Sequence, residues 1–492
     1  MPPQIATLLF AVGIAGLFWL DRDDRVRVSN ALWLPVIWLS INGSRSPSVW
    51  LGTGAPAAEI PGQIPATSLL DQLCAATLIV SGAIVLIRRR KDVRRLLKAS
   101  WPIAFYYLYC LFSLLWSDFP GWGFKRWVRG LGDLIMVLIV ATDTLPTDAL
   151  KKLLSRVGFV LLPASVLLIK YYPDLGQSWD PWGTGQSYTG VTTNKNILGN
   201  LVFLLTLGAL WQVLDLVRDR RAPNRTRRQV AQCTLLAFGV LLLFTAHSAT
   251  SGACFVFGAG LMLATSLPRI RRRPAAVHAL VIAIILSGCL IELLGGRAAI
   301  TGALGRQSDL TGRTEIWSIV IPMVPSWFGG AGFETFWVGP RVAKIFSTVG
   351  GWSMTNEAHN GYIETYLNLG GFGLACIALI LVHGYRKAVG TFRSDSALGA
   401  LLMAYVITAV AYNISEAGFR ILSVEWFFLL LSVTVASWAT SAPKSARRIR
   451  LSQGRVPGQS EPLPALEPSA LEMTGPQQLS LPATDILVHQ SH

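Results

Sequence analysis

The chain has 492 residues, of which 52% are hydrophobic and 14% are charged, and its mean hydropathy is +0.47. A domain of this composition would expose too much apolar surface to water, so the ordinary soluble classes are excluded. The net charge of +16 is compatible with a nucleic-acid-binding protein, so the placement of the basic residues has to decide that class.

Continuous apolar runs of about 16 to 22 residues recur along the chain, and such runs are typical of membrane-spanning helices. The runs do not alternate, which disfavours a β-barrel. They predict an all-α, polytopic transmembrane helical bundle of about 12 to 13 spans that occupies residues 1–440. The predicted helices lie near 5–20, 31–42, 69–87, 100–116, 127–141, 153–172, 197–217, 230–247, 252–267, 275–294, 365–382, 397–413 and 422–440.

Basic residues concentrate in alternate connections between these helices, which hold about 30 of the 43 Lys and Arg. By the positive-inside rule this side is cytoplasmic, so the N-terminus is expected outside and the C-terminus in the cytoplasm. The charge is then topological, and no nucleic-acid partner is expected. The basic connections are 22–27, 88–98, 151–152, 218–228, 269–273, 386–393 and the C-terminal tail.

Both ends of the chain carry a specific expectation. The run 5–20 has no basic segment before it and no small-residue cleavage site after it, which favours an anchor over a signal peptide and leaves open whether it spans fully. Residues 441–492 are rich in Pro, Ser, Gln and Arg, a composition that predicts a disordered cytoplasmic tail.

The sequence offers no metal or cofactor motif. The six cysteines lie in apolar runs without CxxC spacing, and the six histidines form no HExxH or paired-ligand arrangement. We therefore expect no resident metal and no cofactor.

Two outer segments carry the polar residues that a site needs. One is 173–196, which ends in Asn194, Lys195 and Asn196, and the other is a large loop over about 295–364. Within the loop, Arg313 and Trp317 have the i, i+4 spacing of one helical face. The glycines at 329, 330 and 332 that follow either let the backbone approach a ligand or only turn the chain.

The segment 356–373 leads from this loop into an apolar run. On one helix, Glu357, Asn360, Glu364 and Asn368 would form a polar stripe bordered by His359. A histidine beside carboxylates at the mouth of a bundle is a typical general base. The alternative is that His359 only caps or packs at a water-exposed helix start.

His359, Asn360, Gly370 and Gly373 fit the pattern His, then Asn, Ser or Gln, nine residues, Gly, two residues, Gly, and the segment resembles the O-antigen ligase and polymerase family of bacterial envelope enzymes. The elements around GSR at 43–45 and Asn194-Lys195-Asn196 look most like its exopolysaccharide polymerase branch. The resemblance covers about residues 30–430. Its other supporting pieces are LWLPVIWLSINGSR at 32–45, LFSLLWSDFP at 111–120 with Lys125 and Arg126, and Gly312-Arg313 before Trp317.

This resemblance implies a glycosyltransferase C-like bundle in the bacterial inner membrane, with a periplasmic N-terminus and a large periplasmic loop. It implies metal-independent, inverting transfer of a glycan from undecaprenyl diphosphate to an acceptor glycan or to lipid A-core. The lipid bilayer is the expected surrounding, and a flippase and a chain-length regulator are expected neighbours. Polymerase and ligase are not separated by the sequence, because they share the donor and differ in the acceptor.

On this reading His359 accepts the proton of the incoming hydroxyl, while Arg313 and Lys195 stabilise the diphosphate. Substrate binding is assigned to the residues Arg126, Asn194, Asn196, Glu357, Asn360 and Glu364. Many ligases of this family have an arginine where this chain has 247–251 without one, so Lys195 or Arg126 is the expected substitute. A transporter or flippase of a lipid-linked glycan is the alternative class, although transporters place charge near the midplane.

Overall fold

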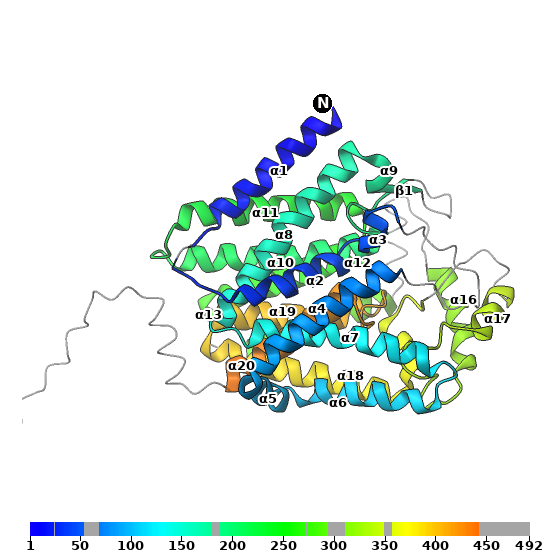
Figure 1. Cartoon of the computed structure of the whole chain (residues 1–492). Helices are drawn as coiled ribbons and strands as arrows, with labels where there is room; N and C mark the ends of the chain where they lie inside the picture. Colours follow the sequence, from blue (N-terminus) through cyan, green and yellow to red (C-terminus); the bar gives the residue numbers. More distant parts are fainter. Residues whose placement is uncertain are drawn as a thin grey trace, which may run out of the picture.

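The computed structural model describes residues 1–23, 25–53, 68–179, 186–271, 274–293, 310–348 and 357–441. In these ranges the chain forms a bundle of helices with one short two-stranded sheet (Figure 1). Every apolar run predicted from the sequence falls on a helix, which confirms the all-α, polytopic membrane architecture. The predicted tail from residue 442 onward, and 295–309 and 349–356 of the predicted outer loop, lie outside the described residues.

The N-terminal third of the chain runs along one side of the bundle (Figure 1). Helices α5 and α6 meet at a bend of 88°, so α5 turns across the end of the bundle instead of continuing through it. The elements are α1 (Pro3–Leu20), η1 (Asn30–Leu32), α2 (Trp33–Asn42), α3 (Pro47–Trp50), α4 (Leu69–Arg88), α5 (Arg90–Ala99), α6 (Trp101–Phe112), η2 (Ser113–Trp116) and α7 (Pro120–Ala141).

The middle third contains the helix α10, much of which is buried in the core. Strands β1 and β2 form an antiparallel pair in which Gln177 lies opposite Tyr188. The elements are α8 (Pro146–Tyr171), α9 (Pro173–Gly176), β1 (Gln177–Trp179), β2 (Gln186–Tyr188), α10 (Lys195–Arg218), α11 (Arg225–Ala246), α12 (Ala249–Ser266), α13 (Pro268–Arg271) and α14 (Pro274–Leu293).

The C-terminal third adds two short helices at one end of the bundle and three long ones inside it. Figure 1 shows α16 and α17 at the same end as β1, whereas α5 and α13 lie at the opposite end. The elements are α16 (Leu310–Val320), η3 (Ile321–Met323), α17 (Pro340–Thr348), α18 (Gly361–Ser394), α19 (Ser396–Tyr412) and α20 (Val424–Ser441).

Eight helices of the described part are long and apolar enough to cross a membrane, or nine if the bent pair α5 and α6 counts as one span. This number is below the 12 to 13 spans predicted. Helix α2 has 10 residues, about 15 Å at 1.5 Å per residue, which is half the hydrocarbon thickness. Helix α7 carries Lys125, Arg126, Arg129 and Asp133, and α19 is a shorter apolar helix of 17 residues. Apolar runs therefore located the helices correctly, including α14 on the predicted span 275–294, and the count of eight or nine applies only to the residues that the structure describes.

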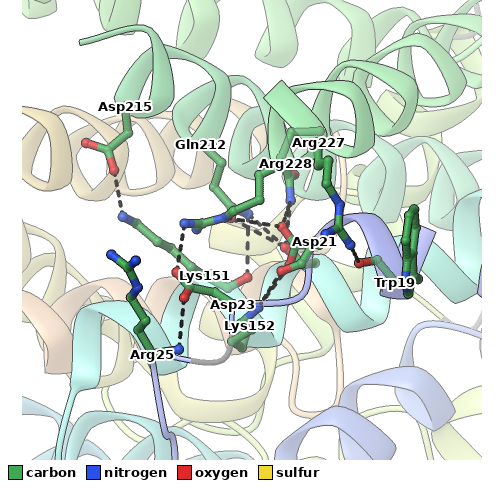
Figure 2. A network of polar contacts seen from close by, with 12 residues as sticks. Trp19, Asp21, Asp23, Arg25, Lys151, Lys152, Gln212, Asp215, Arg227 and Arg228 are labelled. Atoms are coloured by element: carbon green, nitrogen blue, oxygen red, sulfur yellow. Dashed lines mark hydrogen bonds and ion pairs between the residues drawn. The ribbon is translucent and has the colours of Figure 1, made fainter. Parts of the chain in front are cut away.

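Three of the predicted basic connections, 22–27, 151–152 and 218–228, meet at one end of the bundle (Figure 2). Lys152 contacts the Asp21 carboxylate at 3.3 Å, Arg228 contacts Asp23 at 3.1 Å, and Lys151 binds Asp215 at 2.6 Å. Figure 2 shows how the start of α8, the end of α10 and the start of α11 converge on the segment after α1. We call the cluster of Asp21, Asp23, Lys151, Lys152, Asp215 and Arg228 the Asp21 network. It joins basic connections that are far apart in the sequence, as the alternating assignment predicted.

The glycines after η3 are explained by contact between two stretches of backbone. Gly330 has φ +67°, and a Cβ there would lie 2.5 Å from the backbone of Asn368. Gly370 in α18 has φ +65°, and its Cβ would lie 2.2 Å from the Phe328 carbonyl oxygen. At such distances only glycine fits. The turn predicted for this stretch is confirmed. The close backbone approach that these glycines allow is an approach to α18.

Candidate active site

His359 lies in the short segment between the outer loop and α18. Its Nδ1 atom is 3.0 Å from Oε1 of Glu357 and 3.7 Å from Oε2 of Glu416. Both contacts are those of an ion pair when the imidazole is protonated, and Glu357 is the nearer partner. The residue has φ +47°, a left-handed conformation that is uncommon for a side chain larger than glycine. Its side chain is 31% exposed, so a substrate can reach the imidazole.

The backbone on the N-terminal side of His359 is held from two directions. The carbonyl of Ala358 accepts a hydrogen bond from Trp317 Nε1 at 2.8 Å, and its N–H donates to Glu364 at 3.0 Å. Glu364 also accepts from Trp337 Nε1 at 2.8 Å and is only 4% exposed. The left-handed conformation of His359 is therefore fixed by its neighbours, as strained residues at functional sites usually are.

The C-terminal side of His359 is fixed by the start of α18. The Asn360 side-chain oxygen accepts from the N–H groups of Tyr362 and Ile363, both at 3.0 Å, which makes Asn360 the N-cap. At Gly361 a Cβ would lie 1.8 Å from the side-chain oxygen of Asn413, so this position needs glycine. The prediction that one helix carries Glu357, Asn360, Glu364 and Asn368 was wrong for the first two residues, because α18 begins at Gly361 with Asn360 as its N-cap. Only Glu364 and Asn368 lie on this helix.

A first arginine reaches the site from α16. Arg313 binds the Glu416 carboxylate at 3.2 Å and the carbonyl of Ser415. Glu416 also accepts from Asn196 Nδ2, in the first turn of α10, at 3.1 Å. The predicted face of α16 is confirmed as far as Arg313 and Trp317 both turn toward the segment around His359. Glu416 thus joins α10, α16 and His359.

A second arginine comes from the connection between α19 and α20. Arg420 binds Oε2 of Glu357 at 3.0 Å. Burial lowers the pKa of this guanidinium, but the charges of Glu364, Glu334 and Glu357 outweigh burial and raise it. Glu334 in turn binds Arg126 of α7 at 2.7 Å. The described part of the site therefore contains cations from three separate elements.

The titration of the central pair follows from these contacts. Burial lowers the pKa of His359, but the carboxylates of Glu357 and Glu416 raise it to about 9. Burial raises the pKa of Glu357, but His359 and Arg420 lower it to about 2. At neutral pH the resting pair is therefore an imidazolium beside a carboxylate.

Glu357, His359 and Glu416 place one ligand atom each within 4.8 Å of one another, close enough to hold a cation. However, Arg420 already binds Glu357, and Arg313 already binds Glu416. Both carboxylates of this group therefore already have an arginine partner in the structure.

The structure brings most of the sequence-predicted residues together. Arg313, Glu357, Asn196 and Asn360 lie in the shell around His359, and Glu364 lies beneath it.

Three further predicted residues lie at the edge of the site. Arg126 is one ion pair away, through Glu334. Asn194 caps α10 through its side-chain oxygen, and Lys195 begins that helix next to Asn196.

Glu334, Glu416 and Arg420 were missed by sequence reasoning. Glu416 and Arg420 lie in the segment SEAGFR, a short connection between two apolar runs. Charged residues in such a short connection were the signal that could have identified them as site residues. Many ligases of this family have an arginine near the position of 247–251, and Lys195 or Arg126 was predicted to replace it in this chain. In addition, the structure brings Arg420, from the connection between α19 and α20, to Glu357.

The fold and this site define a class: a polytopic membrane protein with a histidine, carboxylate and arginine cluster at one end of its bundle. Residues 234–378 match the family model described as O-antigen ligase, a range that includes Arg313, Glu357 and His359. The chain is also 26% identical over 328 residues to the exopolysaccharide production protein ExoQ of Rhizobium meliloti (strain 1021), which covers 61% of this chain and 68% of that protein. Together they support the O-antigen ligase and exopolysaccharide polymerase-like family and a membrane polysaccharide ligase or polymerase.

Proposed function

We propose that this chain transfers undecaprenyl-diphosphate-linked oligosaccharide to a glycan acceptor at the periplasmic face of the bacterial inner membrane. The observation that carries the proposal is the cluster at His359, in which one imidazole contacts two carboxylates that each bind an arginine. This arrangement combines a proton-transfer group with cationic groups for a diphosphate.

The placement of the charges supports the periplasmic face. The Asp21 network gathers basic connections at one end of the bundle, which the positive-inside rule assigns to the cytoplasm. Helices α16 and α17 lie at the opposite end (Figure 1). On this topology the N-terminus is periplasmic, the C-terminus is cytoplasmic, and the loop at 295–364 belongs to a transmembrane domain of residues 1–440.

The first step is recognition of the diphosphate. A guanidinium has five N–H donors, and the described contacts of Arg313 use its two terminal nitrogens once each, so donors remain for phosphate oxygens. Arg420 binds Glu357, and Lys195 begins the helix that also carries Asn196. These cations stabilise the negative charge that grows on the leaving oxygen as the glycosidic bond breaks.

The second step is the attack. The acceptor hydroxyl oxygen forms a bond to the anomeric carbon, and the bond from that carbon to the diphosphate oxygen breaks. The hydroxyl proton passes to neutral His359, so undecaprenyl diphosphate leaves with the bonding electron pair. One displacement of this kind inverts the anomeric centre, and the arginines provide the charge stabilisation that a metal ion would otherwise supply.

The pKa of about 9 has a direct consequence for this mechanism. At neutral pH only a small fraction of His359 is neutral, so the rate of transfer is expected to rise with pH until the imidazole is deprotonated. If the imidazolium served instead as a third cation for the diphosphate, the rate would fall over the same range.

Within this reaction we favour exopolysaccharide polymerisation over ligation to lipid A-core, because the similar curated protein is named for exopolysaccharide production. The acceptor is then a second lipid-linked glycan. A flippase that delivers the donor and a regulator of chain length are the expected neighbours in the membrane.

Reconstitution tests the proposal against the transporter alternative. The full chain, purified in detergent, is given lipid-linked repeats, and products are separated by length. Elongation without a membrane to cross supports transfer. Protein that elongates nothing, yet moves the lipid-linked glycan across the bilayer of a vesicle, contradicts it.

A deletion strain separates the two enzymatic outcomes. Accumulation of single lipid-linked repeats is expected for a polymerase. Long glycan retained on undecaprenyl diphosphate would assign the chain to the ligases instead.

A further inference from the structure

A second site lies at the opposite end of the bundle, where α4, α5 and α7 meet. A groove of about 650 Å³ opens there, large enough for a lipid headgroup with part of an acyl chain. Its floor is apolar. The floor residues are Ala83, Leu86, Ile87, Val93, Leu97 and Ile135.

Three cations line the same groove. Arg90, Arg94 and Lys98 follow each other at i, i+4 spacing, so they lie on one face of α5. All three are exposed, and within the described residues no ion pair is recorded for any of them. By contrast, Arg95 on another face of α5 binds Asp92 at 3.6 Å. The groove therefore joins an apolar floor to a row of cations that no carboxylate of the described residues neutralises.

The surroundings point to a lipid. Only 11% of the spanning part of α4 is buried inside the protein, so the groove opens toward the hydrocarbon phase. The bend of 88° places α5 across the end of the bundle, where an amphipathic helix lies at headgroup level. Trp101 at the rim is 49% exposed, as is typical of the membrane interface.

The first part of the chain's own C-terminal segment does not suit the groove. Residues 442–460 carry five basic residues and no acid, so they have the same sign of charge as the groove and would be repelled by it. Residues 461–492 carry four acids and no Lys or Arg, so displacement of phosphatidylglycerol by a peptide of this sequence would assign the groove to the tail and overturn the lipid proposal.

We propose that this groove binds one phospholipid with an anionic, phosphate-bearing headgroup. The phosphate contacts Arg90, Arg94 and Lys98, and an acyl chain lies on the apolar floor between α4 and α7. The site is distinct from the His359 cluster, because α5 and α16 lie at opposite ends of the bundle (Figure 1).

Binding of phosphatidylglycerol to the purified full chain tests this, measured as bound lipid by native mass spectrometry and as the lipid-dependent rise in Tm. The variant Arg90→Gln/Arg94→Gln/Lys98→Gln is expected to bind about tenfold or more weakly, since each cation near a headgroup contributes. The matched control Arg88→Gln/Lys91→Gln/Arg95→Gln removes the same charge from residues that do not line the groove, and its binding is expected to change less than twofold.

A second variant separates the groove from surface charge. Ala83→Phe keeps all cations and fills the floor, so it is expected to displace the acyl chain and weaken binding of phosphatidylglycerol. If the triple variant of the groove does not fold, Ala83→Phe still tests whether the groove binds the lipid.

Several results would overturn the proposal. One is equal loss of binding in the matched control, which would leave only general attraction of a basic helix to an anionic surface. Equal binding of zwitterionic phosphatidylcholine would remove the role of the cations. Saturation of the Tm rise by inorganic phosphate or glycerophosphoglycerol would show that the groove takes free phosphate and not a lipid.

Discussion

The two ends of the bundle each hold a cluster of ion pairs, and the two clusters differ in how open they are. In the Asp21 network the side chains of Asp21, Asp23 and Arg228 are 6%, 3% and 12% exposed. In the His359 cluster, His359, Glu357 and Arg420 are 31%, 28% and 25% exposed. The centre of the first cluster is closed against ligands, although Asp215 at its edge is 32% exposed, whereas in the second cluster the central imidazole itself is accessible.

The clusters also differ in what their members do. Asp21 accepts from Lys152 and from Gln232 of α11, so it ties α8 and α11 to the end of α1. The His359 cluster contains an imidazole on a residue in a left-handed conformation, and its Nδ1 atom contacts two carboxylates. Buried ion pairs alone therefore do not mark a reactive site. An accessible titratable group held in strain, with arginine donors to spare, does so more reliably.

The largest effect is expected at His359. His359→Asn removes the proton acceptor while keeping a side chain of similar size, so glycan transfer should fall by about 10²- to 10⁴-fold. The control is His278→Gln, because His278 bonds Tyr385 inside the bundle, away from the His359 cluster. Transfer by purified protein, normalised to folded protein, is the measurement. Retention of near-normal transfer in His359→Asn would remove the proposed base.

A somewhat smaller loss is expected at Arg313. Arg313→Gln removes a charged donor for the diphosphate and should lower kcat/KM for the lipid-linked donor by about a hundredfold. Arg341→Gln is the matched control, because Arg341 lies in α17 and binds Asp118, not Glu416. Equal losses in the two variants would mean that the cations act through general attraction only.

The Asp21 network should respond in stability and not in catalysis. Asp21→Asn leaves buried cations without their carboxylate, which is expected to lower the free energy of unfolding by about 3 to 5 kcal/mol. Asp92→Asn breaks an exposed pair with Arg95 and should change Tm little. Transfer per folded molecule should stay unchanged in both. A selective loss of turnover in Asp21→Asn would contradict the view that the Asp21 network is structural and that only the His359 cluster is catalytic.

The sequence predicted the helices well, because apolar runs report burial in lipid or protein directly. It also predicted the neighbourhood of His359 and Arg313, since a motif and a helical spacing marked them. The helix start at Asn360 was mispredicted because an asparagine fits a polar stripe and an N-cap equally well. Glu416 and Arg420 could not be placed, since their contacts with Arg313 and Glu357 join elements about a hundred and about sixty residues apart.

The account depends most on the proton at His359, and the pH dependence of single-turnover transfer tests it directly. With a pKa raised to about 9, the rate should increase as pH rises toward 9. Glu357→Gln removes a negative charge 3.0 Å from Nδ1, so the pKa should fall and the rise should move down by about 1 to 3 pH units. Glu315→Gln, an exposed acid on α16, should leave the profile in place. A rate that falls through pH 9, or a profile that Glu357→Gln does not move, would contradict His359 as the base.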